Sequence, residues 1–110
     1  YATSYPDWEM YKNTNVQSIL SYSVSKGGLL NLTKLLATYL APKIRVNAIS
    51  PGGIKRKQTK VFIDKYIKKT PMKRMCSTND VVGCIKFLSS DDSSYITGQN
   101  IIVDGGFTLS

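Results

Sequence analysis

The stretch Tyr22-Ser23-Val24-Ser25-Lys26 opens a long helical pattern and places a phenol and an ammonium four residues apart. Side chains at this spacing share one face of a helix. A phenol is a poor acid or base near neutral pH, but a nearby cation favours its deprotonated form. Tyr22 could therefore exchange a proton with a carbonyl or alcohol while Lys26 binds a polyol such as a ribose. The same spacing also occurs in ordinary surface pairs, so the motif alone does not establish catalysis.

The helical pattern around this motif covers residues 18–40 and ends before Pro42. Four leucines recur three or four positions apart, as an amphipathic helix requires: Leu29, Leu32, Leu36 and Leu40. Ser21, Ser25 and Gly28 form a neighbouring stripe of small residues. Such a stripe lets another helix approach closely, or is simply tolerated in a buried helix.

The rest of the chain alternates predicted strands and helices. The expected order is helix 18–40, strand 44–49, helix 57–69, helix 78–89 and strand 99–103. The first strand is mostly apolar, which suits a parallel sheet covered on both faces. Residues 1–15 predict an irregular loop with one helical turn around 7–11. This alternation of helices and strands predicts an α/β fold.

The net charge of +8 is concentrated in one part of the 110-residue chain. Nine of the fifteen basic residues lie within 55–74, where Asp64 is the sole acid. Nucleic-acid binding would require aromatic platforms or a known motif within such a patch. Phe62 and Tyr66 are four residues apart, which places them, with Val61 and Ile67, on the buried side of a helix. We therefore expect no nucleic-acid partner.

Cysteine usage and hydropathy exclude several other classes. Cys76 and Cys84 have no histidine near them, so we expect free thiols, no disulfide framework and no metal site. No apolar run approaches the length of a membrane span, and no signal or transit peptide is recognisable. The chain does not begin with methionine. We expect a cytoplasmic protein without a membrane partner, cut at its N-terminus.

Three blocks resemble the classical short-chain dehydrogenases/reductases in order and spacing. They are YSVSKGG at 22–28, RVNAISPGGI at 45–54 and YITGQNIIVDGG at 95–106. The resemblance covers nearly the whole chain but only the C-terminal half of such an enzyme. It implies that residues 1–110 are the C-terminal part of a single domain with a Rossmann-like doubly wound parallel sheet. The N-terminal cofactor-binding half, with its glycine-rich phosphate loop, would then be missing.

The resemblance also implies roles for individual residues. Tyr22 would be the proton donor or acceptor, and Lys26 would orient the nicotinamide ribose of NAD or NADP. A loop of four residues would line the nicotinamide: Pro51, Gly52, Gly53 and Ile54. The segment after it would be a mobile lid over the substrate, beginning with Lys55, Arg56 and Lys57. Arg56 stands where the family often has a threonine near the cofactor phosphates.

The catalytic serine of the family is not at its usual place. About a dozen residues before Tyr22, this chain has Glu9 and Met10. The longer spacing found in reductases of bacterial flagellin-modification and surface-polysaccharide pathways would place the serine just before Tyr1. Ser4 is the alternative.

These observations lead to one main hypothesis and two alternatives. The main hypothesis is an NAD(P)-dependent oxidoreductase acting on a carbonyl or alcohol, with a sugar or nucleotide-sugar as the small-molecule substrate. A 3-oxoacyl-carrier-protein-type reductase is the first alternative, and a non-catalytic scaffold or interaction subunit with the same fold is the second. The resemblance further implies a homodimer or homotetramer, with the helix over 18–40 in an interface. We expect the 110 residues alone to be inactive.

Overall fold

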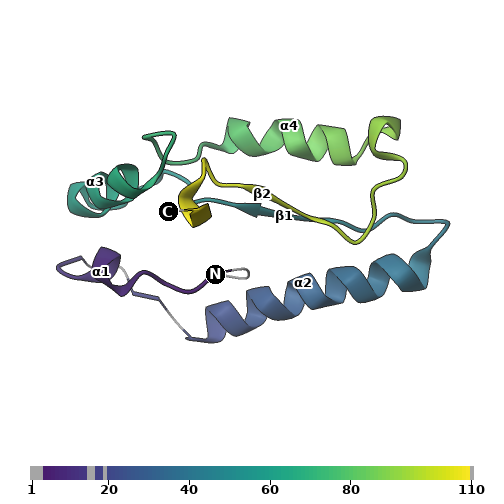
Figure 1. Cartoon of the computed structure of the whole chain (residues 1–110), viewed down its shortest axis with the longest axis horizontal. Helices are drawn as coiled ribbons and strands as arrows, with labels where there is room; N and C mark the ends of the chain where they lie inside the picture. Colours follow the sequence, from purple (N-terminus) through teal and green to yellow (C-terminus); the bar gives the residue numbers. More distant parts are fainter. Residues whose placement is uncertain (1–3, 15–16, 19, 110) are drawn as a thin grey trace.

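The computed structural model describes residues 4–14, 17–18 and 20–109 and has an α/β architecture (Figure 1). In chain order the elements are α1 (Trp8–Tyr11), α2 (Leu20–Leu40), β1 (Ala48–Pro51), α3 (Lys60–Lys69), α4 (Thr78–Leu88), the 3-10 helix η1 (Asp91–Ser93), β2 (Asn100–Val103) and the 3-10 helix η2 (Phe107–Leu109). Figure 1 shows the strands as a middle layer between α4 on one side and α2 on the other. The predicted α/β class is confirmed.

The two strands are parallel. Ala48 lies opposite Asn100, and Pro51 lies opposite Val103. Parallel pairing requires a crossover connection, which α3 and α4 supply here. Both strands consequently end at the same edge of the sheet, close to η2 and α3 (Figure 1). In open α/β sheets this edge is where ligands bind.

The predicted position of the first strand is wrong by several residues, because β1 begins at Ala48 and extends to Pro51. Before it, side-chain hydrogen bonds interrupt the regular backbone ladder. The Asn47 amide donates to the Ile96 carbonyl and its oxygen accepts from the Gln99 amide, at 2.9 and 3.0 Å. The Val46 carbonyl accepts one backbone bond from the Gly98 amide at 2.7 Å, but the regular ladder starts one residue after Asn47.

A second side chain anchors the same segment. The Arg45 guanidinium donates to the carbonyls of Ile96, Leu88 and Ser90 at 2.9–3.2 Å. These bonds join the start of β1 to the end of α4, so residues 44–47 are ordered without being a strand.

The other element boundaries are close to the prediction. The single turn of α1 is confirmed, and α4 ends one residue earlier than expected. Ser77 and Asp80 form a capping box at the start of α4. By contrast, α3 begins at 60 and not at 57, because the Thr59 side chain caps it and the Gln58 side chain binds the preceding loop.

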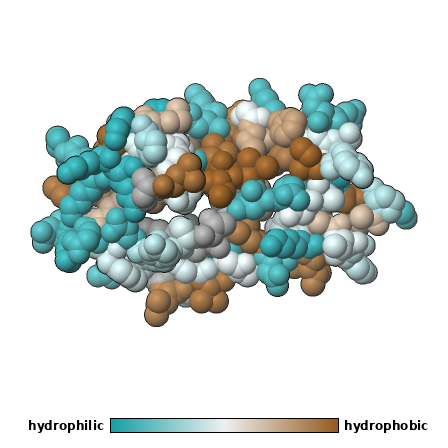
Figure 2. Space-filling model, in the orientation of Figure 1, coloured by the Kyte–Doolittle hydropathy of each residue, from teal (hydrophilic) through white to brown (hydrophobic). Residues whose placement is uncertain are grey.

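The predicted leucine stripe of α2 is not its buried face. Leu29 and Leu32 are half exposed, whereas Thr33 and Ala37 are buried. Small side chains are needed there because Ala37 lies close to Gly98 of the loop before β2. Apolar side chains remain on the surface, and Figure 2 shows hydrophobic groups along the α2 edge of this face.

The buried core lies between α1 and α3. Met10, Phe62, Tyr66 and Met75 form it, with further apolar side chains packed around them. The prediction that Phe62 and Tyr66 are buried is confirmed. The same prediction for Val61 is wrong, since Val61 is 49% exposed. Val61 comes one residue before Phe62, so on the helix its side chain is turned away from the face that buries Phe62 and Tyr66 and toward the lysines. Figure 2 shows this end of the molecule as hydrophilic.

Candidate active site

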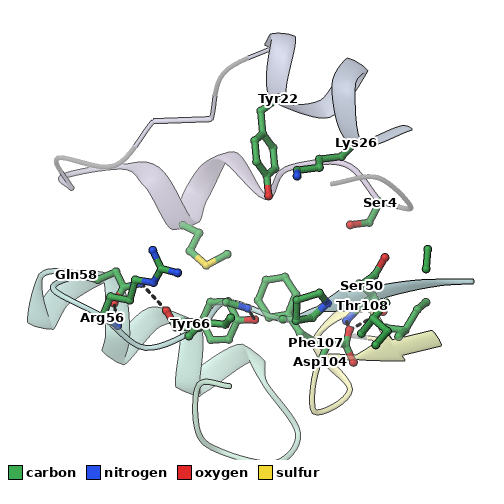
Figure 3. Close-up of a pocket in the computed structure, with 18 of the residues that line it drawn as sticks. Ser4, Tyr22, Lys26, Ser50, Arg56, Gln58, Tyr66, Asp104, Phe107 and Thr108 are labelled. Atoms are coloured by element: carbon green, nitrogen blue, oxygen red, sulfur yellow. Dashed lines mark hydrogen bonds between the residues drawn. The ribbon is translucent and has the colours of Figure 1, made fainter. Parts of the chain in front are cut away.

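A pocket of about 530 Å³ opens at the edge where both strands end. One wall is the N-terminal half of α2, and the opposite wall is the loop after β1 together with α3 and η2. Figure 3 shows Tyr22 extending from α2 toward the side of the pocket that holds Phe107, with the Lys26 side chain running toward the Tyr22 hydroxyl. The fold therefore brings the predicted proton-transfer pair and the predicted cofactor loop to one cavity.

Tyr22 and Lys26 lie side by side in this pocket. The Lys26 ammonium is 5.6 Å from the centre of the Tyr22 ring. Tyr22 is 51% exposed, so its hydroxyl is accessible to a ligand. Among the described residues, the Lys26 ammonium makes no hydrogen bond or ion pair. Both polar groups are thus available to bind and to exchange protons.

The loop after β1 is held by hydrogen bonds on three sides. The Gly52 amide donates to the Val103 carbonyl at 2.9 Å. The Gly53 amide donates to the Tyr66 hydroxyl at 2.6 Å. The Gly53 carbonyl accepts from the Cys76 amide at 3.0 Å. The main chain of the loop is therefore fixed in one orientation at the pocket wall.

The same network leaves one amide of this loop unused. The Lys55 amide donates to the Cys76 carbonyl, and the Arg56 amide donates to the Gln58 side chain. Within the described part of the chain, the Ile54 amide is the one between Gly52 and Arg56 that has no acceptor. Ile54 lines the pocket, so its N–H can donate to a ligand there.

Tyr66 explains why the loop carries two glycines. A Cβ on Gly52 would lie 2.9 Å from both the Tyr66 hydroxyl and the Asp104 Cα, and a Cβ on Gly53 would lie 2.8 Å from the Tyr66 ring. Burial raises the pKa of Tyr66, which keeps the phenol neutral. The sequence placed Tyr66 in the core but gave no sign of this contact with the loop.

Asp104 forms a charged corner of the pocket. Its carboxylate accepts from the Gly106 amide and from both the amide and the hydroxyl of Thr108, at 2.8–2.9 Å. Burial acts to raise the pKa of Asp104, but these hydrogen bonds outweigh it and the pKa is lowered. The turn requires Gly105 and Gly106, whose φ angles of 65° and 85° are in the left-handed region.

The structure separates the three residues predicted to form the start of a substrate lid. Arg56 lines the pocket, whereas Lys55 and Lys57 are exposed outside it. Ser4, the alternative for the missing serine, also lines the pocket, and Figure 3 shows it on the same side as Lys26.

Cys76 and Cys84 are both free thiols. The described residues contain no group of three or more His, Cys, Asp or Glu side chains that could hold a metal ion. Within residues 4–14, 17–18 and 20–109, no helix combines the length and the apolar character needed to cross a membrane.

Comparison with known proteins identifies related sequences. A family model described as enoyl-(acyl carrier protein) reductase matches residues 9–108. The chain is 43% identical over 105 residues to post-translational flagellin modification protein A of Campylobacter coli, covering 94% of this chain and 41% of that protein. It is 45% identical over 96 residues to 3-oxoacyl-(acyl-carrier-protein) reductase FabG of Buchnera aphidicola, covering 83% of this chain and 39% of that protein.

A solved structure is similar over almost the same range. It is a short-chain dehydrogenase from Leptospira borgpetersenii with bound NAD+, with a TM-score of 0.90 and 47% identity. The match covers 97% of this chain and 41% of that one, so the chain spans about two fifths of the length of these relatives. On this evidence, the chain belongs to the short-chain dehydrogenase/reductase family.

Proposed function

We propose that this chain is the C-terminal part of a single domain that interconverts a carbonyl and an alcohol with NAD or NADP. The observation that carries the proposal is the shared pocket of Tyr22, Lys26 and the loop of residues 51–54. The division of the domain is supported by the length of the match, which is about two fifths of each relative.

The residues present fit a nicotinamide cofactor. The unused Ile54 amide would donate to the carboxamide, and the Pro51, Gly52 and Gly53 backbone would line the ring. The free Lys26 ammonium would donate to the ribose hydroxyls. NAD(P), when bound, would supply or accept the hydride.

Tyr22 performs the proton transfer in this proposal. In the direction of reduction, its hydroxyl donates a proton to the carbonyl oxygen of the substrate, and the nearby Lys26 cation stabilises the resulting phenolate. In the direction of oxidation, the phenolate removes the alcohol proton. Arg56 borders the substrate side of the pocket. A serine preceding Tyr1, or alternatively Ser4, would orient the substrate oxygen.

The substrate class rests on the comparisons. The relative named for flagellin modification supports a sugar or nucleotide-sugar. The relative named for 3-oxoacyl-carrier-protein reduction supports the alternative of an acyl substrate on a carrier protein. A non-catalytic subunit is disfavoured because it would have no need for an exposed Tyr22 beside a Lys26 ammonium that pairs with no described residue.

Replacing Tyr22 with phenylalanine tests the mechanism in the full-length protein. Tyr22→Phe should reduce NAD(P)H-dependent turnover by about 100-fold or more, since general acid–base catalysis typically contributes that much. Cofactor affinity should stay within about twofold, because the ring is retained. Tyr39→Phe, an exposed change on the same helix, is the matched control. Turnover near the wild-type level in Tyr22→Phe would remove Tyr22 from this role.

We further propose a cytoplasmic homodimer or homotetramer in which α2 and β2 lie in interfaces. The exposed Leu32 and Leu35 of α2, which do not line the pocket, support this. A monomer in light scattering of the full-length protein at micromolar concentration would contradict it.

We expect no NAD(P)H oxidation by residues 1–110 alone, because the phosphate-binding half of the fold would be missing.

A further inference from the structure

Tyr66 joins α3 to the loop that follows β1. Its side chain is only 5% exposed, and its hydroxyl accepts the Gly53 amide at 2.6 Å. The ring stacks on Phe107 of η2 with 4.4 Å between ring centres and 7° between planes. One side chain thus contacts both segments that follow the ends of β1 and β2.

The position of this hydroxyl is tightly defined. The Tyr66 carbonyl accepts from the hydroxyl of Thr70, which is fully buried, at 2.8 Å. One residue before Tyr66 in α3, the Lys65 ammonium donates to the carbonyls of Glu9 and Lys12 at 3.0 and 2.6 Å. These contacts tie α3 to α1, so the Tyr66 ring has little freedom to leave the loop.

The Tyr66 hydroxyl binds the peptide between Gly52 and Gly53, and backbone hydrogen bonds with Val103 and Cys76 hold the peptides on either side of it. Gly52 and Gly53 lack side chains, so their dihedral angles are intrinsically free. The bond to Tyr66 fixes the plane of the peptide between them. It also uses the Gly53 amide, which leaves the Ile54 amide as the available donor at the pocket wall.

We propose that Tyr66 is a positioning residue for the nicotinamide half of the cofactor. It acts through the Gly52–Gly53 peptide, while the Cys76 amide holds the carbonyl of the next peptide, so these two hydrogen bonds together set where the Ile54 amide points. This inference rests on the proposed function, because it requires that the loop binds a nicotinamide nucleotide. It also means that α3 must lie against the loop, as it does here, for the donor to be in place.

Comparing two nucleotides on the full-length protein tests this role. NADH or NADPH, whichever the wild type binds more tightly, is compared by calorimetry with ADP-ribose or its 2′-phosphate, which has no nicotinamide. Tyr66→Phe keeps the stack on Phe107 and removes only the hydroxyl. It should weaken binding of the reduced cofactor by about 5- to 10-fold, the typical effect of one hydrogen bond, and leave ADP-ribose binding within about twofold.

Two further variants complete the experiment. Tyr95→Phe changes a fully exposed tyrosine and should alter neither affinity. Gly53→Ala places a methyl group 2.8 Å from the Tyr66 ring. It changes the loop partner of the same contact, so it should also weaken binding of the reduced cofactor and leave ADP-ribose binding unchanged. A selective loss in Tyr66→Phe supports the inference, whereas a loss in Gly53→Ala alone would come from the methyl group in the nicotinamide loop and would overturn it.

The negative outcomes are distinct. Equal weakening of both nucleotides in Tyr66→Phe would assign Tyr66 a general structural role and overturn the inference, as would unchanged cofactor affinity in both Tyr66→Phe and Gly53→Ala. A wild-type protein that binds neither nucleotide would refute the proposed function itself, and the inference with it.

Discussion

Asp7 links two segments that are 62 positions apart in the chain. Its carboxylate caps α1 by accepting from the Glu9 amide, and it accepts from the Lys69 ammonium of α3 at 3.0 Å. The hydrogen bond from Lys69 is the main reason why the pKa of Asp7 is lowered. This ion pair holds α1 against the helix that carries Tyr66, so the stability of the site depends on it.

We predict that Asp7→Asn destabilises the full-length protein at pH 7 and that this destabilisation shrinks as the pH is lowered below about 4. Asparagine caps a helix about as well as aspartate, so the change isolates the ion pair, which is worth at most about 1 kcal/mol. Because the folded pKa lies below the unfolded one, the stabilisation is present above about pH 4 and is lost as pH falls through the folded pKa. Urea unfolding of both proteins across this range measures the difference.

Asp92→Asn is the control for this experiment, since Asp92 is exposed and makes no side-chain contact with the described residues. It should shift the unfolding curve by the same small amount at both pH values. A constant difference between Asp7→Asn and the wild type from pH 3 to pH 7 would contradict the role of the Asp7 charge.

Site residues could be predicted where their relation depends on neighbours in the sequence, and not where it depends on contacts between separate segments. Tyr22 and Lys26 are four residues apart on one helix, so their shared face follows from helix geometry alone. The contact between Tyr66 and Gly53 depends on how α3 packs against a loop, and the contact between Asp7 and Lys69 depends on two separate segments. No local pattern encodes such pairs. Sequence could therefore identify Tyr66 as buried but not as a partner of the loop.

At the level of elements, the start of α4 makes the clearest prediction. The Ser77 hydroxyl and the Asp80 carboxylate each accept a backbone amide of the other residue in the capping box. Ser77→Ala should lower the free energy of unfolding by about 1 kcal/mol, because the Asp80 amide loses its acceptor. Thermal or urea unfolding measures this loss. Ser94→Ala, at an exposed serine without a side-chain hydrogen bond to the described residues, should leave stability unchanged, and equal effects of the two changes would contradict the capping role.

Boundaries that depend on side-chain chemistry were the least predictable. Residues 44–47 have the composition of a strand and make one backbone bond, from the Gly98 amide to the Val46 carbonyl, but the side-chain hydrogen bonds of Arg45 and Asn47 interrupt the regular ladder. The start of α3 depends likewise on the Gln58 and Thr59 side chains. In α2 the leucine period was correctly identified as helical. The period does not show which face packs inside this chain, where Thr33 and Ala37 are buried because they allow the close approach that bulky leucines would prevent.

At the scale of the whole molecule, most of the basic patch of residues 55–74 has a structural use. Four of its members bind carbonyls or carboxylates of other segments: Lys65, Lys69, Lys73 and Arg74. Lys60 pairs with Asp64 on the surface of α3. Lys55 and Lys57 make no ion pair with a described residue and lie beside the pocket residue Arg56. This subset, and not the whole patch, is the candidate for attracting an anionic substrate.

We predict that Lys55 and Lys57 raise the rate of substrate encounter without taking part in the reaction. The double charge reversal Lys55→Glu with Lys57→Glu should lower kcat/KM several-fold and leave kcat unchanged, because exposed charges act mainly on association. Added salt should lower the wild-type kcat/KM toward the same value, since the screening length is about 10 Å at 0.1 M. Lys86→Glu with Lys34→Glu, on two other helices, is the control and should have a smaller effect. A wild-type kcat/KM that does not change with salt would show that these lysines are ordinary solvated surface.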